Sequence, residues 1–500
     1  MARAGAAAAG VIARAFGREL ARGVLVLAGS GNNGGDGWVV ARALQAAGYR
    51  VRVWESAPAR TGDAGAERTL AIGAGVELTP ALHFDGEGVV VDALLGTGAR
   101  LPVREDIAVG VRATRHARER GACIAAIDLP TGIDATTGAA DARGNVVTAH
   151  LTITFGTLKR GHLVTRAHCG DVAVVDIGLP PVRGDDFPML LDTAVAQALL
   201  PAVAPDAHKG TKRRVAIVGG AEGMSGAVLL AARGALRTGA GLVKVVVQGP
   251  SLPVLQQALP QALAATWPET GADADTLLDW ADVIAVGPGL GANAATRALV
   301  ERLLEGSPRR PVVLDADALN VFAGDPQTLG RLLDGRPALL TPHPAEMMRL
   351  AGAPDVMTVL AERFEIGARY AHFVDATVLL KGTPTIVTAP DGRRLVTATG
   401  TPALATGGSG DLLTGVTATL LAQLGDALYA GAVGAWAHGR AAELATTQAG
   451  TARGLPLVLV GDALPDALLA AWTEEPVHPQ YPVVCELPSL ATIATPEGAR

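Results

Sequence analysis

The 500-residue sequence is poor in aromatic residues, carries little net charge and contains few cysteines. Aromatic side chains make up only 3% of the residues, too few for the stacking platforms that bind single-stranded nucleic acids. The net charge of -6 provides no strongly basic surface for nucleic acid or for an anionic membrane. The composition therefore argues against both nucleic acids and membranes as partners.

Cysteines and long apolar runs are also scarce. The three cysteines, Cys123, Cys169 and Cys485, show neither metal-ligand spacing nor a disulfide framework, which is typical of a reducing compartment. No apolar run approaches the roughly 20 residues that a membrane span needs. Charged residues interrupt the Ala-rich start of the chain, so no signal-peptide core forms there. We expect a soluble protein in the cytoplasm.

Apolar residues make up 49% of the sequence, and its length exceeds that of one ordinary domain. Short β-branched runs alternate with longer helical patterns in both halves, which predicts two α/β domains with doubly wound, parallel sheets. The alternation breaks in a stretch rich in Pro, Gly and Asp, Gly178–Lys209. We therefore predict domains at residues 1–185 and 190–471, followed by an unpatterned, Pro-rich tail at 472–500.

Three Gly-containing loops in the first half carry acidic or amide side chains. The first loop has the G-x-G-x-x-G spacing of a dinucleotide-binding turn at Gly29, Gly31 and Gly34. It also offers oxygen donors that suit a hard cation or a polar ligand, from Asn32, Asn33 and Asp36. Two later predicted strands end in Asp92 and Asp128. Because the carboxyl ends of parallel strands meet at one edge of a sheet, we expect the three loops to form a ligand site.

These loops resemble the NAD(P)H-hydrate epimerase family over Gly5–Leu179, with similar motifs at Gly31–Gly37, Asp92–Gly98, Asp128–Asp134 and Phe155–His162. The resemblance implies a Rossmann-like domain that interconverts the R and S hydrates of NADH and NADPH. It implies a catalytic, substrate-contacting Asp128 and a potassium ion held by Asn33, Asp92 and Thr131, where the family usually has Ser at the last position. The other substrate-binding residues that it implies are Asn32, Asn33, Gly34, Gly35, Asp36, Gly96, Thr97, Gly98, Ala99, Arg100, Leu101 and Pro102. Family members usually carry a helical arm before the segment that Gly5–Phe16 matches.

The second half contains a Gly-rich loop, Thr406–Asp411, before a predicted helix, Leu412–Gln423. Because its three glycines carry no side chains, the backbone amides at the helix N-terminus are accessible, which predicts a phosphate-binding site. In the first turn of that helix, Asp411 is placed to accept the proton of an attacking hydroxyl, as catalytic Asp residues do in phosphoryl transfer. No Walker sequence occurs, so this is not a P-loop.

The loop resembles that of the ribokinase-like superfamily, and six further motifs resemble the ADP-dependent NAD(P)H-hydrate dehydratase family over Leu190–Ala471. These motifs are His208–Gly210, Gly223–Ala227, Gly287–Gly291, Asp315–Leu319, Thr341–Glu346 and Lys381–Thr385. The resemblance implies a catalytic Asp411, and it implies hydrate contacts from Ala227, Gly289, His343 and Asp411. The nucleotide-binding residues that it implies are Lys381, Gly382, Thr383, Pro384, Thr385 and Gly410.

For three acidic residues within these motifs, the sequence allows two interpretations each. Asp315 and Asp317 are either turn or cap residues or metal ligands, and Glu346 orients either a magnesium shell or the imidazole of His343.

Together, the two resemblances imply a bifunctional repair enzyme. It would epimerise NAD(P)H hydrates and dehydrate the S form with ADP and Mg²⁺, releasing AMP and phosphate, and it would be a homo-oligomer. The main alternative is a small-alcohol kinase of ribokinase-like fold with a non-catalytic, nucleotide-binding N-terminal domain. A third interpretation makes the N-terminal half a non-catalytic module for nucleotide binding or oligomerisation. A Rossmann oxidoreductase would leave the Asn and Asp residues of the first loop and the whole second domain unexplained.

Overall fold

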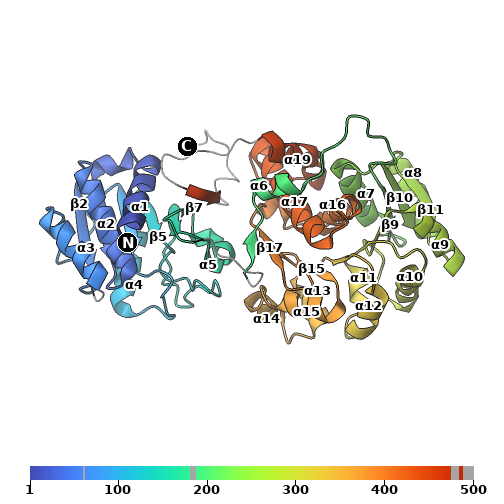
Figure 1. The fold of residues 1–500 in the computed structure, drawn as a ribbon, viewed down its shortest axis with the longest axis horizontal. Helices are drawn as coiled ribbons and strands as arrows, with labels where there is room; N and C mark the ends of the chain where they lie inside the picture. The colour runs from blue at the N-terminus through green and yellow to red at the C-terminus, as the bar shows by residue number, and fades with distance from the viewer. Residues whose placement is uncertain (60–61, 181–186, 474–482, 488–500) are drawn as a thin grey trace. The chain divides into compact units, whose positions relative to one another are not determined.

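The computed structural model describes residues 1–59, 62–180, 187–473 and 483–487, which form two compact units (Figure 1). Unit 1 consists of the described residues between Met1 and Val182 together with strand β18 (Val483–Leu487). Unit 2 consists of the described residues between Arg183 and Glu475. Both units are α/β folds with mainly parallel sheets, which confirms the predicted fold class.

Within the described residues, unit 1 is built around an eight-stranded sheet of order β18-β7-β6-β5-β4-β1-β2-β3. All neighbours are parallel except β18 and β7. Its other strands are β1 (Val24–Ala28), β2 (Val51–Glu55), β3 (Glu77–Leu78), β4 (Val89–Ala93), β5 (Cys123–Ile127), β6 (Leu151–Phe155) and β7 (Asp171–Val175). The strand order reverses between β1 and β4. Ligands bind at such a switch point in open parallel sheets, so the loops after β1 and β4 are positioned for binding.

Helices cover both faces of this sheet. Helices α1 (Ala2–Ala15) and α2 (Asn32–Ala46) pack on the face that alternate residues of β1 and β4 line, and α4 (Glu105–Glu119) packs on the other face. Helix α3 (Gly62–Gly73) packs beside α2. Because alternate side chains of a strand point to opposite faces, the near-continuous apolar runs seen in the sequence fill both layers.

Unit 2 contains a ten-stranded sheet among the described residues, of order β11-β10-β9-β12-β13-β14-β15-β16-β17-β8, in which only β16 runs antiparallel to its neighbours. Its strands are β8 (Met189–Leu190), β9 (Arg214–Val218), β10 (Leu242–Val247), β11 (Leu263–Thr266), β12 (Val283–Val286), β13 (Val312–Leu314), β14 (Ala338–Leu340), β15 (Thr377–Leu380), β16 (Thr385–Thr388) and β17 (Arg394–Thr397). The order reverses between β9 and β12, which makes the loops after these strands a second switch point.

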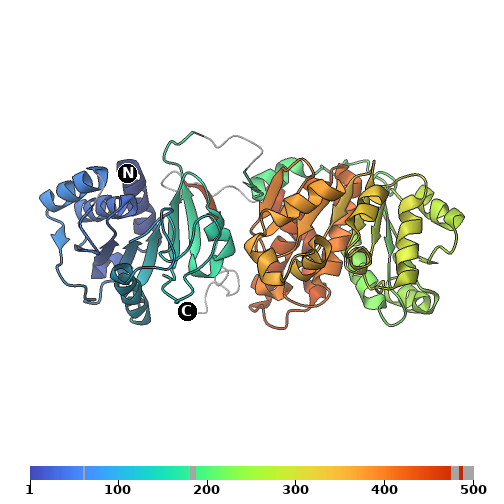
Figure 2. The same cartoon turned by 90° about the horizontal axis from the view of Figure 1, so that it is seen from below.

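Two helical layers enclose this sheet (Figures 1 and 2). One core contains α7 (Ser225–Thr238), α16 (Ser409–Leu424), α17 (Ala427–Ala449) and α19 (Leu464–Thr473). The other contains α9 (Gly271–Trp280), α10 (Ala294–Glu305), α12 (Pro326–Leu333), α13 (Pro344–Ala351) and α15 (Ile366–Val374). Among the described helices, no segment combines the length and the hydropathy that crossing a bilayer requires.

Several elements differ from the prediction. Helix α2 begins at Asn32, so Asn32–Asp36 form its first turn rather than a loop before it. Its glycines are needed there for close packing, since a Cβ on Gly34 would lie 1.8 Å from the carbonyl oxygen of Gly29. Edge strand β11 was not expected, because an edge strand needs no strong apolar alternation. Strand β17, which lies between β16 and the edge strand β8, was not expected either.

The predicted tail without pattern is also partly wrong. Strand β18 lies inside residues 472–500 and pairs antiparallel with β7, because a short β-branched run interrupts the Pro-rich sequence. Most of the remaining tail and the predicted boundary near residue 185 lie outside the described residues.

Candidate active sites

In unit 1, Asp128 directly follows β5 and has a backbone φ of 64°, a left-handed conformation that is rare outside glycine. Its amide donates to the carbonyl oxygen of Ile153 at 2.7 Å, and its own carbonyl oxygen lies 2.7 Å from Nε2 of His162. Burial lowers the pKa of His162 to about 4, so the imidazole is neutral, and its Nδ1 accepts from the Lys159 amide. These bonds stabilise a strained backbone of the kind often found at functional sites.

The two oxygens of the Asp128 carboxylate have different surroundings. Oδ1 lies 2.7 Å from Nζ of Lys159 and accepts from Oγ1 of Thr154 at 3.1 Å. Lys159 also contacts Oγ1 of Thr154 at 2.6 Å and donates to the carbonyl oxygen of Phe155 at 3.1 Å, so all three of its ammonium protons have partners. Oδ2 accepts only the longer 3.3 Å bond from the Thr97 amide among the described residues. Lys159 thus anchors one oxygen, and the other faces the loop after β4.

Asp36 brings a second carboxylate to the same site. Its Oδ1 is buried and has no hydrogen-bond partner among the described residues. Burial raises the pKa of Asp36 to about 7, and the charge of Asp128 contributes to that rise. Two carboxyl groups in one site are suited to acid–base work.

The predicted cation ligands include a tightly bonded pair. Asp92 is fully buried and accepts bonds of 2.8 Å from both the amide and Oγ1 of Thr131. Burial raises the pKa of Asp92 to about 6, while bonds from Thr131 and Leu94 lower it. Asn33 has a buried Nδ2 that lacks a partner among the described residues. The oxygen ligands available here are the carboxylate of Asp92, the hydroxyl of Thr131 and the amide oxygen of Asn33, and hard oxygen ligands of this kind suit a cation such as K⁺.

The loop Gly96–Pro102 lies against this set of side chains. A Cβ on Gly96 would lie 3.2 Å from Oδ1 of Asn33 and 3.2 Å from Oδ2 of Asp128, so the structure brings these three residues together. Asn32 is exposed at the start of α2. By contrast, Gly34 and Gly35 are buried in packing contacts, and substrate binding by them stays a prediction.

In unit 2, Asp411 lies in the first turn of α16, as predicted, although the helix begins three residues earlier than expected, at Ser409. Its N-cap, Gly408, has a φ of 91°, which favours glycine. Burial raises the pKa of Asp411 to about 6, and the nearby charge of Asp315 adds to the rise. The carboxyl group is therefore ionised at neutral pH and basic enough to accept a proton.

A buried charge network stands beside Asp411. Nζ of Lys381 lies 2.8 Å from Oδ1 of Asp315 and 3.9 Å from Glu346, and Oγ1 of Thr414 donates to the other Asp315 oxygen at 2.6 Å. Although burial lowers the pKa of Lys381, the carboxylates of Asp315 and Glu346 raise it above its ordinary value. A Cβ on Gly410 would lie 3.2 Å from Lys381 Nζ. Lys381, Gly410 and Asp411, three predicted site residues, are thus neighbours, and Asp315 positions the lysine.

His343 caps helix α13. Its Nδ1 accepts from the backbone amides of Ala345 and Glu346, so the ring proton is on Nε2, 3.3 Å from Oε1 of Glu346. Burial lowers the pKa of His343, with a further effect of Lys381, which keeps the ring neutral. Of the two roles considered for Glu346, orientation of the imidazole is therefore supported. A neutral imidazole with both nitrogens engaged is a poor general base.

The remaining predicted residues lie on nearby loops. Gly289 follows β12, and a Cβ on it would lie 3.1 Å from the Cβ of Ala227, so these two predicted hydrate contacts are adjacent. Lys381–Thr385 connect β15 to β16. Asp317 accepts from the amide of Gly291 at 2.7 Å, which supports its role in a turn. No group of three or more His, Cys, Asp or Glu side chains among the described residues forms a metal site.

Sequence reasoning gave no role to several residues that contact the site. The sequence could have identified Lys159 as a functional residue, because it is one of only five lysines and lies within the motif Phe155–His162. Thr154 and Thr414 could not be identified in this way, because a threonine in a strand or helix is ordinary. Their contacts with Asp128 and Asp315 depend on how β6 packs beside β5 and how α16 packs on the sheet.

Known protein families match both halves of the chain. A family model described as NAD(P)H-hydrate dehydratase matches residues 215–465, and one described as YjeF-related protein N-terminus matches residues 1–161. The bifunctional NAD(P)H-hydrate repair enzyme Nnr of Moorella thermoacetica is 37% identical over 471 residues, covering 89% of this chain and 86% of that protein. The protein of the same name from Escherichia coli is 36% identical, with 90% and 86% covered.

Solved structures resemble unit 2. A ribokinase-like superfamily protein from Enterococcus faecalis is 24% identical, with a TM-score of 0.50 over 59% of this chain and 99% of its own, which indicates the ribokinase-like fold. An ADP/ATP-dependent NAD(P)H-hydrate dehydratase from Bacillus subtilis, co-crystallized with ATP and Mg²⁺, is 29% identical, with a TM-score of 0.49 over 57% of this chain and 99% of its own. The kinase alternative does not explain why both halves of the chain match bifunctional NAD(P)H-hydrate repair enzymes. The relatives of similar length show that the chain belongs to the family of bifunctional NAD(P)H-hydrate repair enzymes.

Proposed function

We propose that this chain repairs hydrated NADH and NADPH, with unit 1 epimerising the R and S hydrates and unit 2 dehydrating the S form with ADP. The observation that carries the proposal is the position of Asp411, a basic carboxylate at the N-terminus of α16 beside the Lys381–Asp315 pair. This arrangement joins a base, a phosphate cradle and a phosphate-binding cation in one place.

In unit 2, Asp411 takes the proton of the C6 hydroxyl as its oxygen attacks the terminal phosphorus of ADP, and the bond to AMP breaks. The lone pair of N1 then expels phosphate from C6, and the departing phosphate takes a C5 proton as the C5=C6 bond of NAD(P)H forms. Lys381 and the bare amides of the loop stabilise the charge on the transferring group. Mg²⁺ would neutralise phosphate charge, held mainly by phosphates and water with Glu346 or Asp411 behind its water shell, since Mg²⁺ needs few protein ligands.

In unit 1, Oδ2 of Asp128 takes the proton of the C6 hydroxyl while the C6–N1 bond breaks to give an aldehyde, and protonated Asp36 donates to N1. The carbonyl then turns, N1 closes on its opposite face, and both protons return, so that only the configuration at C6 changes. A potassium ion held by Asn33, Asp92 and Thr131 would neutralise the buried charge of Asp92 and fix the loops around the ring. We further propose that the protein works in the cytoplasm as a homo-oligomer.

The direct test uses a mixture of R and S NADH hydrates with ADP and Mg²⁺, followed by the return of reduced-nicotinamide absorbance. We expect complete recovery, because unit 1 supplies the S form as unit 2 consumes it. Recovery of the S fraction alone would contradict an active epimerase. Formation of a stable phosphorylated product, without free phosphate, would instead support the kinase alternative.

Replacing Lys159 with methionine is expected to slow epimerisation by about 10–100-fold, because misplacing a catalytic group costs rates of that order. Rates of R-hydrate consumption, with dehydration kept in excess, measure the effect. Lys159→Arg keeps the charge and should largely preserve the rate. An unchanged rate in Lys159→Met would refute the positioning role.

A further inference from the structure

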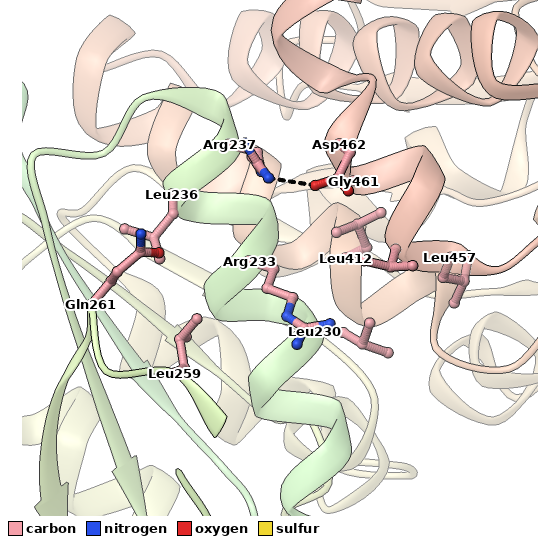
Figure 3. Close-up of a pocket in the computed structure, with 11 residues that line it drawn as sticks. Leu230, Arg233, Leu236, Arg237, Leu259, Gln261, Leu412, Leu457, Gly461 and Asp462 are labelled. Carbon is pink, nitrogen blue, oxygen red and sulfur yellow. Dashed lines mark hydrogen bonds and ion pairs between the residues drawn. The ribbon is translucent and has the colours of Figure 1, made fainter. Parts of the chain in front are cut away.

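A groove of about 470 Å³ runs along helix α7 in unit 2, within the range of about 300–1,000 Å³ typical of ligand sites (Figure 3). Side chains from α7 face those from the start of α16 and from helix α18 (Leu457–Asp462) across it. Five leucines line the groove, among them Leu230, Leu412 and Leu457. Two arginines of α7, Arg233 and Arg237, add positive charge.

The groove adjoins the Gly-rich loop Thr406–Asp411. A Cβ on Gly408 would lie 2.5 Å from Cδ1 of Leu230, 3.1 Å from Cδ1 of Leu457 and 4.0 Å from Oδ2 of Asp411. Two lining leucines therefore contact the residue that caps α16, on the side where the Asp411 carboxylate lies. These contacts place the groove beside Asp411.

The two glycines that flank Asp411 separate two sides of the site. Gly410 faces Lys381 and Asp315, whereas Gly408 faces the leucines of the groove. In the proposed reaction, the phosphoryl donor needs the cation Lys381, so the donor belongs on the Gly410 side. The groove on the Gly408 side is then available to the acceptor, which is the hydrated dinucleotide.

The two arginines differ in whether their charges are paired within the described structure. Arg237 pairs with Asp462 at 2.5 Å, as the dashed line in Figure 3 marks. Arg233 is partly buried, and no hydrogen bond or ion pair is found for it among the described residues. On helix α7, Ala227 neighbours Leu230 and Leu230 neighbours Arg233, because each pair is three residues apart. At about 1.5 Å per residue, Arg233 lies roughly 9 Å along the axis from Ala227, comparable to a ribose and its phosphate ester.

We propose that this groove binds the pyrophosphate and adenosine end of the hydrated dinucleotide, with Arg233 contacting the pyrophosphate and the leucines packing against the adenosine. The proposal rests on the proposed function, which places the hydrated ring at Asp411. A guanidinium group matches phosphate oxygens in a paired geometry, and such charge-assisted bonds are strong.

The test compares two substrates, the S hydrate of NADH and the S hydrate of dihydronicotinamide riboside, which lacks the pyrophosphate. For each enzyme, the ratio of kcat/KM for the dinucleotide to kcat/KM for the riboside is measured with saturating ADP and Mg²⁺. Arg233→Met is expected to lower this ratio at least tenfold, through a higher KM for the dinucleotide. Arg233→Lys, which keeps the charge, should lower it less. Arg331→Met, an exposed arginine of α12 in the same unit, should leave it unchanged.

An unchanged ratio in Arg233→Met would overturn the proposal, as would equal losses on both substrates. A higher KM for ADP with an unaltered hydrate KM would assign the groove to the donor instead, and a change in sedimentation would assign it to a second copy of the chain. If the wild-type protein converts neither hydrate, the proposed function fails. Calorimetric binding of the NADH hydrate to wild type and Arg233→Met then still decides whether the groove holds the dinucleotide.

Discussion

Replacing Asp411 with asparagine is expected to slow hydrate dehydration by about 10²–10⁴-fold, the usual contribution of a positioned general base. Asparagine keeps the shape of the side chain and cannot accept the hydroxyl proton. Release of phosphate from ADP, measured with pure S hydrate, gives the rate. Epimerisation of the hydrates in unit 1 serves as the internal control and should not change.

The pH dependence of the wild-type enzyme gives a second measure of this role. The pKa of Asp411 is raised to about 6, mainly by burial, so the carboxyl group is protonated and inactive below that pH. The rate of dehydration should therefore fall as the pH drops through about 6. The residual rate of Asp411→Asn should not show this fall.

The stability of Asp411→Asn separates lost chemistry from lost structure. A carboxyl group with a raised pKa destabilises the folded state above that pH, because the buried charge is less favourable than in the unfolded chain. Removing the charge should leave the melting temperature at neutral pH unchanged or higher. An inactive variant that melts earlier would point to a structural role, and one with more than a tenth of wild-type activity would exclude Asp411 as the base.

Replacing Asp128 with asparagine is expected to reduce epimerisation by a similar factor of about 10²–10⁴. The structure predicts a second effect that has no parallel at Asp411. Lys159 loses the carboxylate that accepts one of its protons, and a partly buried ammonium group without its partner costs about 1–3 kcal/mol. The single variant should therefore be both inactive and less stable.

The double variant Asp128→Asn/Lys159→Met distinguishes these effects. It removes the unpaired charge, so we expect stability to return toward the wild-type value while epimerisation stays absent. Consumption of pure R hydrate, with added S-specific dehydration, measures activity, and chemical denaturation measures stability. Recovery of epimerisation in the double variant would show that Asp128 acts only through the fold.

Much of the site could be predicted because its residues lie where buried strands end. Asp92 and Asp128 close apolar runs, and Asp411 follows a Gly-rich loop, so local patterns place all three at sheet edges. The start of α2 at Asn32 could not be predicted, because Asn and Gly are poor helix formers, and packing against β1 and β4 overrides that preference.

Contacts between distant segments were harder still to predict. Lys159 reaches Asp128 only because β6 lies beside β5 in one register. Arg233 lines a groove only because α7 packs near α18, whose residues are more than two hundred positions away in the chain. No periodicity within one segment encodes either contact.

Strand β18 has a consequence for any attempt to separate the two activities. It comes from the C-terminal end of the chain, yet it completes the sheet of unit 1 beside β7, after all of unit 2 has been traversed. In terms of chain connectivity, unit 2 is thus an insertion within unit 1. A fragment that ends after unit 1 would leave the backbone groups along β7 unpaired, and such exposed edges recruit other strands. An isolated epimerase fragment should therefore include the β18 segment, joined by a linker, to remain well folded.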